Sequence, residues 1–550
     1  MSGNEPTDES ERETGAQPAD SEDASTQSDE QVTEQSDQSE QAEQQSSNSD
    51  QAADQAQEQT ADVDQTAEQP ANADQATEQP QEQDAGSNQG GEQVEEQPTD
   101  SDQLNSSGST ESTVAFAEGD TSQAAGTGGG ATNVSVSSGS ARTVMSPFPH
   151  KLPDPLNVGS GFSNALQIAL DHSITGDGAT DKGVIDDSRF SGLPDPRDIP
   201  ISIVALDGSG QAAGQHEFDM YYSGSLLKVA AMYAAYQLRI AVNDLAASLP
   251  IDPANDATAT TNLFNTIRAT FNDEIANKVA LLPAFIDREL RVPKYDIIFT
   301  ATRPPGGRFM LEFTTGNHSA DPEHVPSDTF EPNLVDMIVG SHNASAGFCI
   351  RNLGYGWING LLESAGLFFP IKVPPAGRSG LGIWLAGDYG GAKVATIESV
   401  NDGDVKQVTD TQHMAQLLTL LFNKALVRNV ANPPFMSGNV AMLELLSRAV
   451  NHPHARSLLI RASPAPSFTV LHSKIGVGEL KGGACIDIPD RNIVTDRCTY
   501  SEAAIVESGG RKFVVVWQGI VYHKENPANW DAEILRMVTI IQKMIDNFHP

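Results

Sequence analysis

Residues 221–232 read Tyr-Tyr-Ser-Gly-Ser-Leu-Leu-Lys-Val-Ala-Ala-Met, and they lead from a strand-like run into an apolar, helix-like run. Within them lies Ser225-x-x-Lys228, the only Ser-x-x-Lys in the chain. On a helix, a lysine three residues after a serine lies one turn away on the same face, where it can take the serine's proton. The first turn of a helix also offers free N–H groups to a developing oxyanion. The stretch therefore predicts a nucleophilic serine at the start of a helix.

Charge divides the 550-residue chain into two regions. Residues 1–140 contain 32 Asp or Glu and a single basic residue, Arg12. Such a segment buries too little apolar surface to offset its chain entropy, so we expect a disordered acidic tail with a Gly/Ser linker over 1–144. The remaining residues, 145–550, have the composition of a globular domain, with an insertion at about 250–325. The acidic balance argues against nucleic acid and anionic membranes as partners.

The sequence shows no apolar run long enough to span a bilayer and no signal peptide after Met1, which predicts a cytoplasmic location. Its three cysteines are odd in number and unpatterned in spacing, so we expect reduced structural thiols at Cys349, Cys485 and Cys498. Three histidines attract attention, but no His-x-x-x-His pair lies on a predicted helix, and no metal is expected at His342, His452 and His454. No cofactor is implied, and the sequence does not determine the oligomeric state.

Hydrophobic periodicity outlines the elements of residues 145–550. Strands are expected at 201–207, 216–222, 467–472, 502–507 and 512–521. Helices are expected at 161–173, 225–249, within 255–291 as two patterns, and at 334–339, 344–368, 409–427 and 530–548. A hairpin is expected at 295–302 and 308–314, and a Gly- and Pro-rich loop at 370–392. Strands segregated at both ends predict an α+β fold, with one antiparallel sheet flanked by helices and a helical lobe.

Two further motifs follow the first in order: Ser341-x-Asn343 and Lys474-x-Gly476. Isolated matches are weak signals, since Ser437-x-Asn439 and Lys481-x-Gly483 also occur. All three motifs in order, each at the expected element, resemble the serine β-lactamase and penicillin-binding protein superfamily, and most closely class A β-lactamase-like serine hydrolases. The resemblance covers roughly residues 196–550, and it implies a β-lactamase/transpeptidase-like fold.

The resemblance implies acyl transfer through an acyl-enzyme. Ser225 would attack an amide or lactam carbonyl, and Lys228 would take or relay its proton. Ser341 would pass the proton to the leaving nitrogen, and Asn343 would hold Lys228 and the substrate amide. Such a mechanism needs side chains and backbone N–H groups alone.

The third motif would bind the substrate. Lys474 would supply positive charge to a substrate carboxylate, with Gly476 beside it in the substrate-binding strand. The backbone N–H groups of Ser225 and Val477 would form the oxyanion hole, where the loss of one donor typically lowers the rate by about 10²–10³.

The chain departs from the family pattern in three ways. Residues 369–397 contain no Glu-x-x-Leu-Asn motif and no glutamate; Glu398 comes next and Asp388 is an alternative, but neither has the expected neighbours. Ile475 stands where the family has Thr or Ser, so a carboxylate-binding hydroxyl is missing. The 295–314 hairpin lies in a long insertion and is expected to roof the cleft. Slow deacylation is the predicted consequence of the missing glutamate.

Several functions stay open at this point. The first is a serine hydrolase acting on β-lactams or related small-molecule or peptide amides. D-alanyl peptidase, penicillin-binding or esterase activity shares the three motifs, and a serine glutaminase is a more distant option. A catalytically inactive binding protein, with the acidic tail as its interaction element, is the alternative of a different class. Because the family usually works outside the cytoplasm, an extracytoplasmic or cell-surface location is the alternative to a cytoplasmic one.

Overall fold

The computed structural model describes residues 145–156, 164–178, 180–251, 256–282, 286–303, 309–373, 377–388, 395–428, 437–480, 497–523 and 527–549. The chain divides into two units, Met1–Gly129 and Gly130–Pro550, and all the described residues belong to the second unit. The predictions for the tail and for Cys485 lie outside the described residues.

A five-stranded antiparallel sheet with the strand order β11-β12-β13-β1-β2 forms the centre of the second unit. The strands are β1 (Ile201–Ala205), β2 (Ala212–Gln215), β11 (Thr469–Glu479), β12 (Arg497–Ser508) and β13 (Arg511–His523). The first and the last strands of the described residues therefore meet in one sheet, with Ile203 opposite Val515. This confirms the predicted antiparallel sheet, and it leaves β11, which carries the third motif, at an edge.

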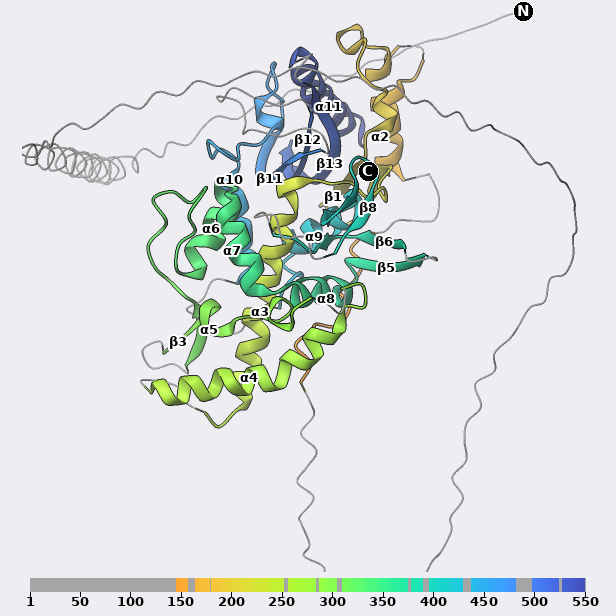
Figure 1. Cartoon of the computed structure of the whole chain (residues 1–550). Coiled ribbons are helices and arrows are strands. Elements are labelled where there is room, and N and C mark those ends of the chain that lie inside the picture. Colours follow the sequence, from red (N-terminus) through yellow and green to blue (C-terminus); the bar gives the residue numbers. More distant parts are fainter. Residues whose placement is uncertain are drawn as a thin grey trace, which may run out of the picture. The chain divides into compact units, whose positions relative to one another are not determined.

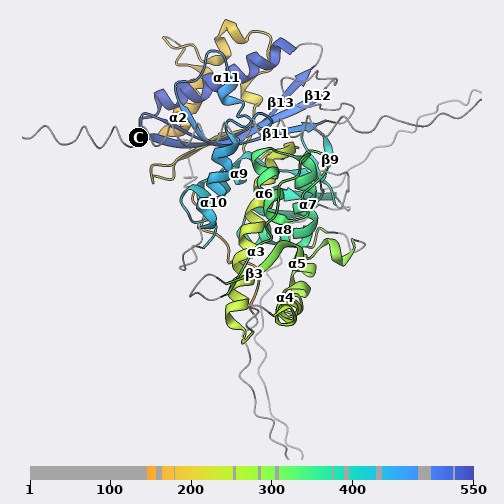
Figure 2. The same cartoon turned by 90° about the vertical axis from the view of Figure 1, so that its left-hand side faces the viewer.

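Two hydrophobic cores lie on the two faces of the sheet. Val514 and Val516 of β13 belong to the first core, which they share with the helical lobe. Val515 and Trp517 alternate with them and belong to the second core. The second core is covered by α2 (Ala165–Thr175) and α11 (Pro527–Asn547), while the lobe lies on the opposite face (Figures 1 and 2). Because both faces are buried, the inner strand β13 carries a continuous apolar run, Phe513–Trp517.

The helical lobe is built around α3 (Lys228–Ser248), which runs away from the sheet (Figure 1). Its other helices are α4 (Ala257–Lys278), α5 (Tyr295–Ile298), α6 (Phe330–Val339), α7 (Asn343–Leu353), α8 (Tyr355–Ala365), α9 (Thr411–Phe422) and α10 (Gly438–Ala449). Small antiparallel pairs join them: β3 (Phe299–Thr302) with β4 (Met310–Phe313), β5 (Phe368–Val373) with β6 (Gly377–Gly382), β7 (Trp384–Leu385) with β10 (Gln407–Val408), and β8 (Ile397–Ser399) with β9 (Gly403–Val405). None of the helices in the described ranges has the length and apolar character needed to cross a membrane.

Three predicted elements differ from the structure. The strand expected at 216–222 is wrong, because β2 ends at Gln215 and the left-handed backbone of His216 (φ 48°) turns the chain away. The loop expected at 370–392 instead contains the β5–β6 hairpin. One long helix, α4, and a short 3₁₀ turn replace the two helices expected within 255–291, and α10 has no counterpart among the predicted elements.

The predicted β3–β4 hairpin is confirmed, but its expected position over the site is wrong. Asn243 of α3 donates to the carbonyl of Leu311 at 2.9 Å and accepts from the Leu311 N–H at 2.8 Å. Asn243 lies fifteen residues beyond Lys228, which corresponds to about 22 Å along a helix. The hairpin therefore packs on the far half of α3.

The cysteines differ from the expected set of reduced thiols. Cys349 is free and buried, and burial raises the pKa of its thiol well above the usual value. Cys498, in contrast, is disulfide-bonded. The prediction is therefore wrong at Cys498, where an unpatterned sequence spacing concealed a covalent link at the start of β12.

Candidate active site

Ser225 lies in a short 3₁₀ turn, Gly224–Leu227, that runs directly into α3. The turn abuts the edge strand β11: a Cβ added at Gly224 would lie 2.1 Å from the carbonyl oxygen of Val477. Gly224 also has a left-handed backbone (φ 53°), which favours glycine. Both its backbone conformation and the nearby Val477 carbonyl therefore require glycine at position 224. The predicted start of the helix near Ser225 is confirmed.

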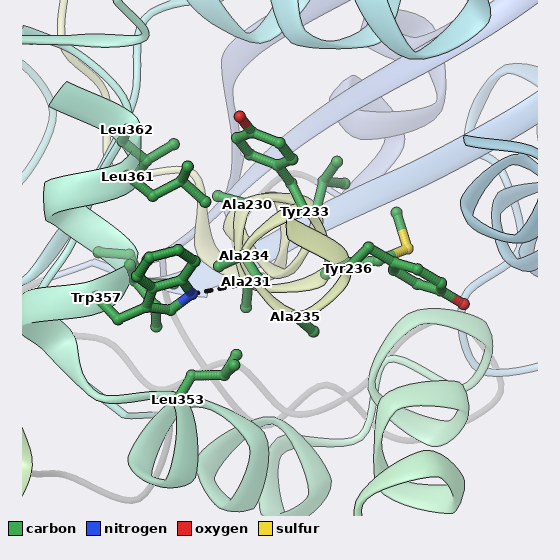
Figure 3. Close-up of a cluster of buried hydrophobic side chains, with 14 of the residues drawn as sticks. Ala230, Ala231, Tyr233, Ala234, Ala235, Tyr236, Leu353, Trp357, Leu361 and Leu362 are labelled. Carbon is green, nitrogen blue, oxygen red and sulfur yellow. Dashed lines mark hydrogen bonds between the residues drawn. The ribbon is translucent and has the colours of Figure 1, made fainter. Parts of the chain in front are cut away.

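The helix behind Ser225 is held rigidly in the first core. One side of α3 presents alanines, among them Ala230 and Ala234, on which side chains of α8 pack closely (Figure 3). The indole N–H of Trp357 donates to the carbonyl of Ala234 at 2.9 Å. Small side chains let the helices approach closely, and the buried indole finds its hydrogen-bond partner there. This packing fixes the position of Lys228 at the first turn of the helix.

Lys228 is fully buried, and its ammonium lies among oxygen atoms of the second motif. Its Nζ donates to the carbonyl of Ser341 at 2.5 Å, to Oδ1 of Asn343 at 2.8 Å and to Oγ of Ser341 at 3.4 Å. A buried charge is costly unless hydrogen bonds satisfy it, and these acceptors supply them. The structure thus brings together the first two motifs.

Lys474 approaches the same serine from β11. Its Nζ donates to Oγ of Ser341 at 2.6 Å and to the carbonyl of Ile475 at 3.2 Å. Burial lowers the pKa of Lys474 to about 7. Ser341 itself adopts a left-handed backbone (φ 60°) in the turn between α6 and α7, a costly conformation for a serine. All three motifs therefore meet at one hydroxyl group.

The backbone of β11 faces the turn that holds Ser225. The carbonyl oxygen of Val477 would lie 2.1 Å from a Cβ added at Gly224, so the backbone of β11 closely approaches the residue before Ser225. A Cβ at Gly476 would lie 2.0 Å from the carbonyl oxygen of Ser223, so only glycine permits this approach.

The structure places the three residues at which the sequence departs from the family pattern as follows. Ile475 is buried in the second core, on the opposite face of β11 from Lys474. Glu398 is exposed on β8. Asp388 is buried, and its carboxylate accepts from Nη1 of Arg351 at 2.6 Å.

Sequence reasoning missed Glu502, a carboxylate buried beneath β11. It accepts from the hydroxyls of Ser457 at 2.5 Å and Ser473 at 2.6 Å, and from the backbone N–H groups of Leu458 and Leu459. Burial raises its pKa, while these donors lower it. A glutamate directly before the apolar run Ala503–Val506 was the available signal. It anchors the strand residue that precedes Lys474.

A histidine cluster borders Ser341, formed by His342, His452 and His454. The ring centroids of His342 and His454 are 5.6 Å apart, and those of His452 and His454 are 5.7 Å apart. Within the described part of the chain, no group of three or more His, Cys, Asp or Glu could hold a metal ion. The sequence singled out these histidines individually but not their proximity to one another.

No protein-family model matches the sequence, and no curated protein matches it. Among solved structures, PBP-A is similar at 14% identity and a TM-score of 0.33, over 72% of this chain and 99% of that chain. A class A β-lactamase from Mycobacterium abscessus is similar at 14% identity and a TM-score of 0.31, over 62% of this chain and 92% of that chain. A β-lactamase from Chitinophaga pinensis is similar at 11% identity and a TM-score of 0.32, over 62% and 92%.

Proposed function

We propose that this protein is a serine acyl-transfer enzyme in which Ser225 forms an acyl-enzyme with an amide or lactam carbonyl. The observation that supports it best is the meeting of Lys228 and Lys474 at the Ser341 hydroxyl, at 3.4 and 2.6 Å, beside the turn that carries Ser225. Two buried lysines and a serine at one point form a path along which a proton can move. A structural role alone gives no reason to bury two ammonium groups together, because each costs free energy.

These groups can account for every proton transfer in the reaction. A neutral Lys228 accepts the proton of Ser225 as its Oγ attacks the carbonyl carbon. Ser341 gives its own proton to the leaving nitrogen as the carbon–nitrogen bond breaks. A lysine ammonium then returns a proton to Ser341. The net result moves the Ser225 proton to the leaving group and leaves an ester on Ser225.

The backbone completes the reaction centre. The close approach of the Val477 backbone to the turn that carries Ser225 supports a role for the backbone N–H groups of both residues. Together they serve as the oxyanion hole in this proposal. Asn343 keeps Lys228 in place through its Oδ1, and Gly476 allows β11 to approach.

The proposed substrate class is β-lactams or related amides, and the acyl-enzyme is proposed to be long-lived. Asp388, one of the two carboxylates considered for deacylation, is engaged by Arg351, and the other, Glu398, points to solvent. Penicillin-binding or D-alanyl peptidase activity fits slow deacylation better than rapid β-lactam turnover. The alternative is a catalytically inactive binding protein, which covalent labelling of Ser225 would exclude.

Labelling with a fluorescent penicillin tests the proposal. We expect a covalent band on the wild-type protein and none on Ser225→Ala. Ser248→Ala, an exposed serine at the far end of the same helix, is the matched control and keeps the band. Equal labelling of Ser225→Ala and the wild type contradicts the assignment of Ser225.

The disulfide at Cys498 favours the extracytoplasmic alternative for location. Disulfides persist mainly in oxidising compartments. We therefore propose that the folded domain works outside the reducing cytoplasm. Thiol alkylation of protein taken directly from its native cells tests this: Cys498 stays unmodified before reduction, whereas its prompt alkylation contradicts the proposal.

A further inference from the structure

His342 follows Ser341 directly, and its ring folds back over Gly340, two residues earlier. A Cβ added at Gly340 would lie 2.3 Å from Nε2 of His342, so the ring occupies the space where any other side chain would begin. The backbone of Gly340 is right-handed (φ −86°), a conformation that alanine adopts equally well. The glycine is therefore needed for the ring of His342 and not for the backbone.

The same turn is tied to α6. The N–H groups of Gly340 and His342 both donate to the carbonyl of Asp336, at 3.1 and 3.3 Å. Ser341 lies between them in its left-handed conformation. A strained residue keeps its conformation only when its surroundings hold it on all sides. Here the ring of His342 and the carbonyl of Asp336 hold the two residues that flank Ser341.

The ring of His342 also reaches across to the turn after α10. Its centroid lies 6.4 Å from that of His452 and 5.6 Å from that of His454. His342 and His452 are half-buried and His454 is exposed. Neutral imidazoles pack together at such distances, whereas imidazolium ions repel each other.

The surroundings of the cluster are mainly cationic. The titratable and charged groups that act on it from the packed elements are Lys228 of α3, Asp336 of α6, Arg448 of α10, Lys474 of β11, and Asp321 with His318 before α6. Burial is the largest cause that lowers the pKa of His342, to about 4, followed by the opposing effect of Asp336 and the repulsion of His454, Lys228 and His452. A proton on His342 is therefore opposed both by burial and by its cationic neighbours.

We propose that His342 is a positioning residue for Ser341: its neutral ring, seated on Gly340 and enclosed by His452 and His454, fixes the Ser341 hydroxyl between Lys228 and Lys474, and protonation of the cluster releases it. This inference rests on the proposed acyl transfer, and it adds that the position of the Ser341 hydroxyl depends on pH. His342 touches no reacting atom in this account and acts through Ser341.

A double-mutant cycle between Gly340 and His342 tests the positional part. The readout is the rate constant for acyl-enzyme formation with benzylpenicillin at pH 7.5, from intact mass. Gly340→Ala displaces the ring and is expected to slow acylation by about ten- to a hundredfold, as small misplacements do. In the His342→Ala background the same change is expected to alter the rate less than about twofold, because no ring is left to displace. Equal effects of Gly340→Ala in both backgrounds would overturn the proposal.

The pH dependence tests the titration and needs no activity. His342→Asn keeps a polar residue before α7 and does not titrate. A histidine whose pKa is lower in the folded state than in the unfolded state stabilises the fold above the unfolded pKa, and that contribution disappears as the pH falls from about 6.5 to about 4. We therefore expect the wild-type melting temperature to fall more than that of His342→Asn between pH 7.5 and 4.5.

A control variant and the acylation assay distinguish a failure of the His342 proposal from a failure of the proposed acyl transfer. His216→Asn, at an exposed and left-handed position, is expected to follow the wild type. Equal melting losses in the wild type and His342→Asn overturn the inference, even where acylation proceeds. The absence of any acyl-enzyme on the wild type overturns the proposed function, and the melting comparison still decides the role of His342 in holding the turn.

Discussion

Lys228 and Lys474 donate to the same oxygen atom, Oγ of Ser341, although one lysine opens α3 and the other lies on the edge strand β11. Both side chains are almost fully buried. Two ammonium groups so close together repel each other, and burial penalises each of them. The pair therefore favours a state with one proton fewer, and that state contains the neutral amine which the proposed chemistry needs.

The first prediction concerns the pH dependence of acylation. Burial lowers the pKa of Lys474 to about 7, so the lysine pair loses a proton near neutral pH. We expect the acylation rate to rise about tenfold per pH unit below pH 7 and to level off above it. Stopped-flow or quenched mass measurements between pH 5.5 and 8.5 check this. A rate that is flat across this range is incompatible with the relay.

Replacement of Lys474 by methionine is expected to stabilise the fold while it removes activity. Below pH 7 the lysine is protonated in both folded and unfolded states, so the folded protein bears the full cost of a buried charge. Between pH 7 and about 10.5 the folded state loses its proton first and the cost declines. We expect Lys474→Met to gain on the order of 3 kcal/mol in the free energy of unfolding at pH 6, and less at pH 9.5.

Urea unfolding at the two pH values measures that gain, and acylation by penicillin is expected to fall by about 10²–10⁴. If Lys474→Met were less stable than the wild type at pH 6, the buried lysine would stabilise the folded state, and the expected cost of burying its charge would be wrong.

Gly224 is predicted to tolerate no side chain. Gly224→Ala would place its Cβ 2.1 Å from the carbonyl oxygen of Val477, and a backbone neighbour cannot give way easily. Gly509 has a matching left-handed backbone (φ 57°, against 53° at Gly224), but nothing lies within 4 Å of an added Cβ. Gly509→Ala is therefore expected to cost only about 1 kcal/mol of backbone strain.

Thermal unfolding compares the two variants, and we expect Gly224→Ala to be clearly the less stable and to lose acylation. Equal melting temperatures would mean that the Ser225 turn does not press on β11.

Restoring the family's hydroxyl at position 475 is predicted to fail. Ile475 points into the second core, away from Lys474, so a threonine there places its hydroxyl among apolar side chains. We expect Ile475→Thr to lose about 1–3 kcal/mol of stability and to leave the acylation rate with benzylpenicillin unchanged. An acylation rate raised tenfold or more would show that the side chain faces the substrate.

Much of the fold could be read from the sequence because its signals are local. An apolar, helix-like run after a strand-like run indicated the start of α3, and segregated strands indicated one antiparallel sheet. The strand expected at 216–222 failed because the left-handed His216 carries no local signal. The β5–β6 hairpin was hidden by prolines and glycines that also mark loops.

The sequence predicted the individual residues of the candidate site, but not the contacts between them. The order of three motifs named Lys228, Ser341 and Lys474, while their convergence on one oxygen depends on the approach of β11 to the Ser225 turn. Glu502 and the histidine cluster depend on contacts between residues far apart in the chain. Such contacts leave no periodic or spacing pattern, so a single sequence cannot reveal them.

The central claim is that Ser225 becomes acylated. Intact mass after incubation with benzylpenicillin, for the wild type and Ser225→Ala, tests it most directly. We predict an increase of one antibiotic mass on the wild type alone, persisting for hours because Asp388 is engaged by Arg351 and Glu398 is exposed. A wild-type protein that carries no adduct and consumes no penicillin, or an adduct that survives Ser225→Ala, would contradict the account.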